Sequence, residues 1–213
     1  MRTTRLARLG GVAAVAALAV TGWLSPAWGQ AAPPATAQPA TVAADGMSPA
    51  AATSLASQLA AARQATVKYA TNLARAKADG YFIITKMMPD MGFHFLNPNI
   101  SGFSVTKPPI LVYEHRGSTW QLGALEWVFT SMPKSVPLPN ATFGSFPAAC
   151  HYADGTFIPD ATAATCPTTA PQSGAKFTFW HPDLITMHVW IWYPNPAGLY
   201  ASTNPDIAPF NSG

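Results

Sequence analysis

The chain is poor in charge, and its few charged residues are unevenly placed. Charged residues make up 10% of the 213 residues, and Glu114 and Glu126 are the only glutamates. The formal net charge of +3 depends on Arg2, Arg5 and Arg8. Without these three arginines, nine basic residues balance nine acidic ones. A chain with no net charge has no electrostatic footprint for nucleic acid, so we expect no nucleic-acid partner.

Several catalytic motifs are also absent from the sequence. It contains no glycine-rich phosphate loop, no HExxH motif and no Gly-x-Ser-x-Gly elbow. These absences argue against a kinase, a zinc protease of that type and a serine hydrolase. Any functional site must therefore be sought among side chains that the fold brings together.

Long apolar runs are confined to the N-terminus. Residues 1–8 are basic, residues 9–24 are apolar, and small residues surround Trp28. This order is typical of a secretory signal peptide, which we predict at residues 1–29. The apolar run is shorter than the roughly 20 residues that span a bilayer, which argues against an uncleaved anchor. We therefore expect a secreted or cell-envelope protein with no transmembrane segment after cleavage.

The expected mature chain has one linker and one domain. Residues 30–47 are rich in Ala, Pro and Thr and carry one charge, so we predict a disordered linker. Residues 48–213 are long enough for a single domain with one core. The two cysteines, Cys150 and Cys166, lack the CxxC spacing of a metal site, and in an exported chain they favour a disulfide.

The apolar periodicity predicts an α+β fold. Ser48-Pro49 begins a helix whose apolar stripe continues to Ala76, and Asp79-Gly80 ends it. Short strands are then predicted at 81–85 and 92–96, a hairpin at 110–115 and 119–129, and one strand near 151–157. We expect this one long N-terminal helix to pack on a curved antiparallel sheet or partial β-barrel, with a disulfide-stapled loop region at residues 131–175.

The most informative stretch is residues 184–193, which reads as one buried strand. If it is extended, one face carries Thr186, His188, Trp190 and Trp192. The other face is also apolar, so His188 is the one ionisable group in a buried strand. A buried histidine needs polar partners.

Two further polar residues interrupt apolar runs in the same way. His94 lies between two phenylalanines, and alternation places Glu126 on a face with Trp120, Leu122, Ala124 and Val128. We hypothesise that His94, Glu126 and His188 meet as a facial triad for zinc, iron or manganese, with Glu114 as a further ligand or hydrogen-bond acceptor. A purely structural polar network, a metal-free catalytic site and three unrelated burials are the alternatives.

A second candidate site involves soft ligands. Met88, Met91 and His94 fall within eight residues of one another and suit copper(I). Methionines beside a strand also serve as core filler, which is the alternative reading. The other histidines, His115, His151 and His181, are interpreted as loop or strand-edge residues rather than ligands.

One pattern extends over most of residues 60–205. Its segments are ADGY at 78–81, MGFHFLNP at 91–98, PILVYE at 109–114, ALEW at 124–127, HVWIW at 188–192 and NPAG at 195–198. This series resembles a family of uncharacterised exported bacterial proteins. The resemblance implies export and a single-domain architecture, and it implies no activity.

The sequence thus supports three functional hypotheses. The first is an exported protein with a buried divalent-metal site. The second is a metal-free ligand-binding or envelope interaction module with an aromatic-lined pocket. The third is a copper-handling protein that uses the stretch from Met87 to His94.

Overall fold

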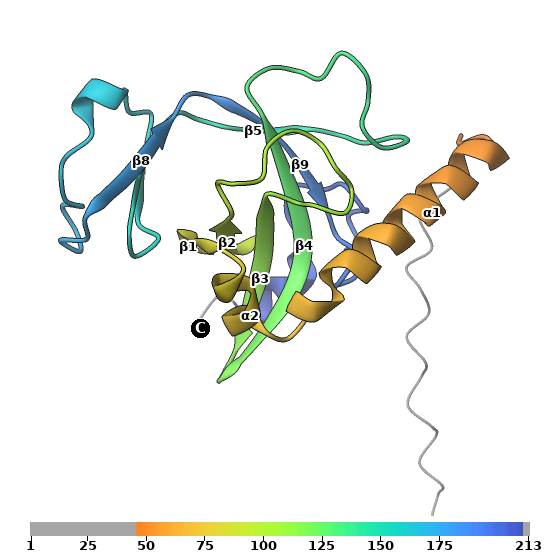
Figure 1. Cartoon of the computed structure of the whole chain (residues 1–213), viewed down its shortest axis with the longest axis horizontal. Helices are drawn as coiled ribbons and strands as arrows, with labels where there is room; N and C mark the ends of the chain where they lie inside the picture. The colour runs from red at the N-terminus through yellow and green to blue at the C-terminus, as the bar shows by residue number, and fades with distance from the viewer. Residues whose placement is uncertain (1–45, 211–213) are drawn as a thin grey trace, which may run out of the picture. The chain divides into compact units, whose positions relative to one another are not determined.

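The computed structural model describes residues 46–210. The predicted signal peptide and nearly all of the predicted linker lie outside these residues. The described residues form helices and two antiparallel sheets (Figure 1). Among them, no helix combines the length and apolar character that crossing a bilayer requires.

The helical segment begins where the sequence predicts but is broken. Helix α1 (Pro49–Thr66) begins after Ser48, whose side chain accepts a hydrogen bond from the backbone of Ala51. The 3-10 turn η1 (Val67–Tyr69) follows, and α2 (Leu73–Ala78) is a separate helix. The prediction of one continuous N-terminal helix was therefore wrong, because the long helix occupies residues 49–69 and ends well before Asp79.

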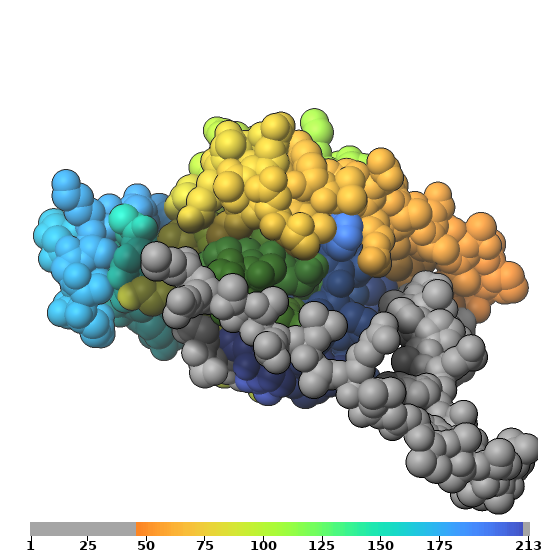
Figure 2. All heavy atoms as spheres, turned by 90° about the horizontal axis from the view of Figure 1, so that it is seen from below, coloured from red at the N-terminus to blue at the C-terminus, as the bar shows by residue number. Residues whose placement is uncertain are grey.

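The break has a physical cause in the sheet. The carbonyl of Ala70 accepts a hydrogen bond from the backbone of Leu122 at 2.8 Å, and the carbonyl of Tyr69 accepts one from the Tyr113 hydroxyl. The carbonyl of Ala70 is thus bonded to a strand, and that of Tyr69 is shared between the Tyr113 hydroxyl and the backbone N–H of Asn72. Asn72 then caps the N-terminus of α2 through its side chain. Figure 2 shows the helical segment, in orange and yellow, as a layer beside the green and blue strands.

The main sheet has six antiparallel strands that curl into a half-barrel. Their order is β1 (Phe82–Met88), β2 (Gly92–Leu96), β3 (Ile110–Arg116), β4 (Thr119–Phe129), β9 (Leu184–Val189) and β5 (Gly144–Phe146). The predicted curved antiparallel sheet is confirmed, as are the strand at 92–96 and the hairpin of β3 and β4. The small strand β5 was not predicted.

The sheet has two differently packed faces. One face carries Leu111, Leu125 and Met187 and packs with α1 and α2 in the larger core cluster. The other face carries Val112 and Ala124 and belongs to a smaller core cluster. The helices therefore close one face of the sheet, and the opposite face is left to the site described below.

A β-bulge in β4 changes which residues share a face of the strand with Glu126. The register shifts between Val112 and Tyr113, which face Ala124 and Leu122 across the ladder, so Gly123 is an extra residue. Leu122 consequently packs on the helix side, as Trp120 does, while Ala124 and Glu126 lie on the other face. The predicted grouping of Glu126 with Ala124 holds, and its grouping with Trp120 and Leu122 was wrong.

The strand that contains His188 is shorter than predicted. It ends at Val189, because the backbone N–H groups of Trp192 and Tyr193 both donate to the carbonyl of Gly123. The indole of Trp192 reaches Thr66 of α1 at 3.0 Å, so Trp192 lies on the helix side instead of beside His188. The bend thus lets the end of this segment pack against the helix.

The region predicted as a stapled loop contributes two strands to a second, three-stranded sheet. The single strand predicted near 151–157 was wrong, because β6 (Ala149–Tyr152) and β7 (Phe157–Pro159) are two short antiparallel strands joined by a turn. The third strand, β8 (Phe177–His181), lies beyond that region and was not predicted. The predicted disulfide between Cys150 and Cys166 is confirmed and ties β6 to the segment after the 3-10 turn η2 (Ala163–Thr165). A third 3-10 segment, η3 (Pro205–Phe210), follows the main sheet.

We predict that Gly92→Ala destabilises the protein more than Gly102→Ala does. Both glycines have positive φ, +105° and +70°. A Cβ at Gly92 would lie 2.6 Å from the carbonyl oxygen of Tyr113, whereas a Cβ at Gly102 has open space. Gly102→Ala should cost about 1 kcal/mol for its backbone alone, and Gly92→Ala about 2–3 kcal/mol because strain adds to it. Urea unfolding of both variants measures this difference, and equal losses would contradict it.

Candidate metal centre

Three strands place His94, Glu126 and His188 on the same face of the main sheet. Glu126 in β4 lies directly opposite His188 in β9. On its other side Glu126 faces Ile110 of β3, while His94 of β2 faces Val112, two residues farther along β3. Side chains two residues apart share a face of a strand, so the ring of His94 lies on the same face as the carboxylate. The three residues are 3–5% exposed.

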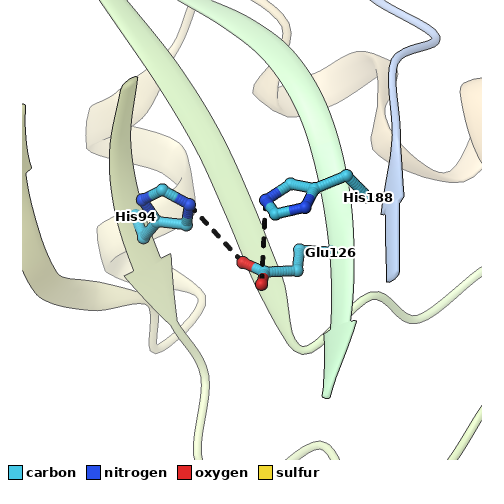
Figure 3. Close-up of side chains that lie close together, drawn as sticks. All are labelled: His94, Glu126 and His188. Atoms are coloured by element: carbon cyan, nitrogen blue, oxygen red, sulfur yellow. Dashed lines mark ion pairs between the residues drawn. The ribbon is translucent and has the colours of Figure 1, made fainter. Parts of the chain in front are cut away.

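Both imidazoles turn a ring nitrogen toward the carboxylate of Glu126 (Figure 3). Nε2 of His94 lies 3.5 Å from one carboxylate oxygen, and Nε2 of His188 lies 3.7 Å from the other. One potential ligand atom from each residue lies within 4.8 Å of the others. The predicted convergence of these three residues is therefore confirmed, and the group could hold a metal ion.

The distances fit ligands around an ion better than hydrogen bonds. A hydrogen bond from nitrogen to oxygen measures about 2.7–3.2 Å. Two ligand atoms that each lie about 2.1 Å from a tetrahedral ion are about 3.4 Å apart. Nε2 of His188 is also buried without a hydrogen-bond partner among the described residues. The distances between the ring nitrogens and the carboxylate oxygens of Glu126 thus leave room for an ion among them.

Thr85 fixes the orientation of the His94 ring by contacting the nitrogen that faces away from Glu126. The hydroxyl of Thr85 in β1 lies 2.8 Å from Nδ1 of His94 and accepts a hydrogen bond from its backbone N–H at 3.1 Å. Nδ1 is thereby engaged, and Nε2 is the nitrogen that faces Glu126. Polar contacts of this kind behind a ligand ring are usual in protein metal sites.

Burial keeps all three groups neutral when no ion is bound. It raises the pKa of Glu126 to about 8. Burial lowers the pKa of His94 to about 3, with a smaller contribution from the neighbouring His188, and lowers that of His188 to about 4. At neutral pH the contacts between these groups are consequently not ion pairs. A cation placed among them would favour the ionised carboxylate and replace its proton.

The three residues belong to the wall of a pocket of about 280 Å³. Most of the wall is apolar, with Leu96, Val128 and Phe179 among its members. Met88 and Met91, the candidate thioether ligands, also line this pocket together with His94. The structure therefore brings the residues of both predicted sites to one cavity.

Glu114 lies elsewhere and is not part of the three-residue group. Its side chain is fully buried, and neither carboxylate oxygen has a hydrogen-bond partner among the described residues. The space beside it exists because Gly123 has no side chain, since a Cβ there would lie 2.7 Å from Oε1 of Glu114. Burial raises the pKa of Glu114 to about 7, against the opposing charge of Arg116.

Two further histidines line the same pocket although sequence reasoning placed them at strand edges. His151 is buried in β6, and His181 is partly buried at the end of β8. Burial lowers the pKa of His151 to about 4, while the carbonyl of Ile84 opposes that shift. The alternation of Phe179 with His181 indicates a strand face, and this signal could have identified His181. His115, by contrast, stacks on Trp120 and does not line the pocket.

Comparisons with family models, with curated proteins and with solved structures found no match for the chain. The function must therefore be argued from the residues of the pocket.

We predict that the metal-free protein loses stability as the pH rises from 6.5 to 8. Glu126 keeps its proton to about pH 8 when folded but only to about 4.5 when unfolded, so rising pH favours the unfolded chain. His94 and His188 have the opposite effect, which ends near their unfolded pKa of 6.5. This effect has faded about one pH unit above that value, whereas Glu126 and Glu114, whose pKa values are raised, act across the whole interval.

Urea unfolding in the presence of a chelator, with the disulfide intact, measures this pH dependence. The Glu126→Gln variant should lose less stability across the same interval, because its amide does not titrate. A free energy of unfolding that increases from pH 6.5 to 8 would show that Glu126 is ionised in the folded metal-free protein.

Proposed function

We propose that this is an exported metal-binding protein whose ion is held by His94, Glu126 and His188. The observation that carries the proposal is the geometry of three buried ligand atoms that lie within 4.8 Å of one another. The two nitrogen–oxygen distances, 3.5 and 3.7 Å, exceed hydrogen-bonding distance and are close to the spacing of ligands around one ion. A structural network would instead close these gaps, because a buried polar group without a hydrogen bond is costly.

The donor set suits a divalent transition ion. Imidazole binds zinc, copper and iron, and two imidazoles with one carboxylate form the facial triad found with open coordination positions. Magnesium and calcium prefer oxygen-only sites and fit this donor set less well. Zinc, iron, manganese and copper are therefore the candidate ions.

The pocket defines the chemical class of the partner. Three protein ligands leave positions on the ion for water or for a small molecule. The surrounding wall is mostly apolar and encloses about 280 Å³. A small organic ligand with an apolar body and one oxygen or nitrogen donor would fit this environment. If the ion is catalytic, metal-assisted hydrolysis or oxidation is the corresponding chemistry.

Copper handling is a second candidate function, favoured by one observation. Met88 and Met91 line the same pocket as His94, so two thioether side chains and one imidazole border a single cavity. Soft thioethers favour copper(I) over the divalent ions. In this alternative the methionines, and not Glu126, would determine the affinity.

Export is part of the proposal and is supported by two features. The basic, apolar and small residues of 1–29 follow the order of a signal peptide. The disulfide between Cys150 and Cys166 fits an oxidising compartment, where such bonds persist.

We expect the untagged protein, purified from its native compartment, to retain about one ion per chain in the group of His94, Glu126 and His188. Elemental analysis by mass spectrometry measures its identity and amount. Glu126→Gln and His188→Asn should each lower occupancy of this group more than tenfold, because one ligand is removed. Met88→Leu with Met91→Leu should lower it only if the ion is copper(I).

His115→Asn is the matched control, since it removes a histidine of the same sheet that does not line the pocket. It should keep the ion content of the parent protein. A folded parent protein that takes up no ion at this group, even after incubation with excess zinc, would favour a metal-free binding module. Circular dichroism of each variant separates loss of the ion from loss of the fold.

A further inference from the structure

The pocket contains a second pair of ligand atoms outside the group of His94, Glu126 and His188. Nε2 of His151 lies 3.0 Å from Nε2 of His181. His151 comes from β6 and His181 from β8, two neighbouring strands of the smaller sheet. Both rings line the same pocket as the triad.

The outer nitrogen of each ring is already engaged with the backbone. Nδ1 of His151 lies 2.8 Å from the carbonyl oxygen of Ile84, and Nδ1 of His181 lies 2.7 Å from that of Pro182. A carbonyl oxygen can only accept, so both Nδ1 atoms carry hydrogen. A neutral imidazole has one N–H, and therefore each Nε2 presents a lone pair to the other ring. Two facing lone pairs need a cation between or beside them.

We propose that His151 and His181 bind a second metal ion through their Nε2 atoms. The distance of 3.0 Å between the two nitrogens falls within hydrogen-bonding range, so the facing lone pairs, and not the distance, carry this proposal. The carbonyl behind each Nδ1 matches the usual arrangement of metal-binding histidines, in which the outer N–H is held by an acceptor. The orientation of both rings thus agrees with a bound ion.

The second pair is connected to the first group through β1. The carbonyl of Ile84 holds the ring of His151, and the hydroxyl of the next residue, Thr85, contacts the ring of His94. Consecutive residues of one strand therefore orient one ring of each set toward a shared cavity. The second ion would have access to the same small molecule as the first.

The donor set also indicates which ion this pair would take. Two neutral imidazoles add no negative charge and favour zinc, copper or nickel over magnesium and calcium. With two protein ligands instead of three, the pair should bind more weakly than the triad. We therefore expect two ions to be taken up in sequence, with the pair filled second.

Zinc uptake by the untagged full chain tests the proposal. Protein is dialysed against excess zinc and then against buffer at a fixed free zinc concentration, and the bound metal is counted. We expect two ions for the parent protein and one for His151→Asn and for His181→Asn. Asparagine can still donate to the carbonyl behind Nδ1 but has no atom at the position of Nε2. His115→Asn, the control, should keep two.

The triad variant Glu126→Gln separates this inference from the proposed function. If the pair binds zinc and the triad does not, the parent protein binds one ion. The Glu126→Gln variant then keeps that ion, and the His181→Asn variant loses it. Equal zinc contents in the parent, His151→Asn and His181→Asn would overturn the second site and would mean that a proton joins the two rings. His181 is partly exposed, so its variant should fold even if His151→Asn does not.

Discussion

Glu126 is a carboxylate buried in an apolar pocket, and its charge has to be neutralised there. In water the ionised acid is stable, but within this sheet it is 5% exposed and its pKa rises to about 8. A proton or a cation can meet the requirement. The two imidazoles alone do not, because burial keeps His94 and His188 neutral and both lie beyond hydrogen-bonding distance. The site is thus built around one charge that a metal ion could balance.

The residues that stabilise the fold and those that form the site lie on opposite faces of the main sheet. Leu111, Leu125 and Met187 pack with the helices on one face of the sheet, where the larger core cluster lies. Glu126 and His188 point from the same strands to the other face, which borders the pocket. Since side chains alternate along a strand, a single ladder can supply a packed core and a polar site at once. A register slip by one residue would exchange the two sets.

The core of the site could be predicted from the sequence because polar residues within apolar runs are costly to bury. His94, Glu126 and His188 each lie in such a run. Glu126 pairs directly with His188, so regular alternation of side chains along the two strands places both residues on the same face. The bulge at Gly123 could not be foreseen, since a β-bulge is a property of the pairing and not of one strand. His151 and His181 were missed because their role depends on a short sheet within a proline-rich region.

The most direct test is anomalous diffraction from crystals of the zinc-loaded protein, recorded on both sides of the zinc absorption edge. Our account predicts a peak about 2.0–2.2 Å from Nε2 of His94, Nε2 of His188 and a carboxylate oxygen of Glu126. Absence of a peak at that position, together with a direct hydrogen bond between the carboxyl group and either ring, would show that the three residues form a structural network.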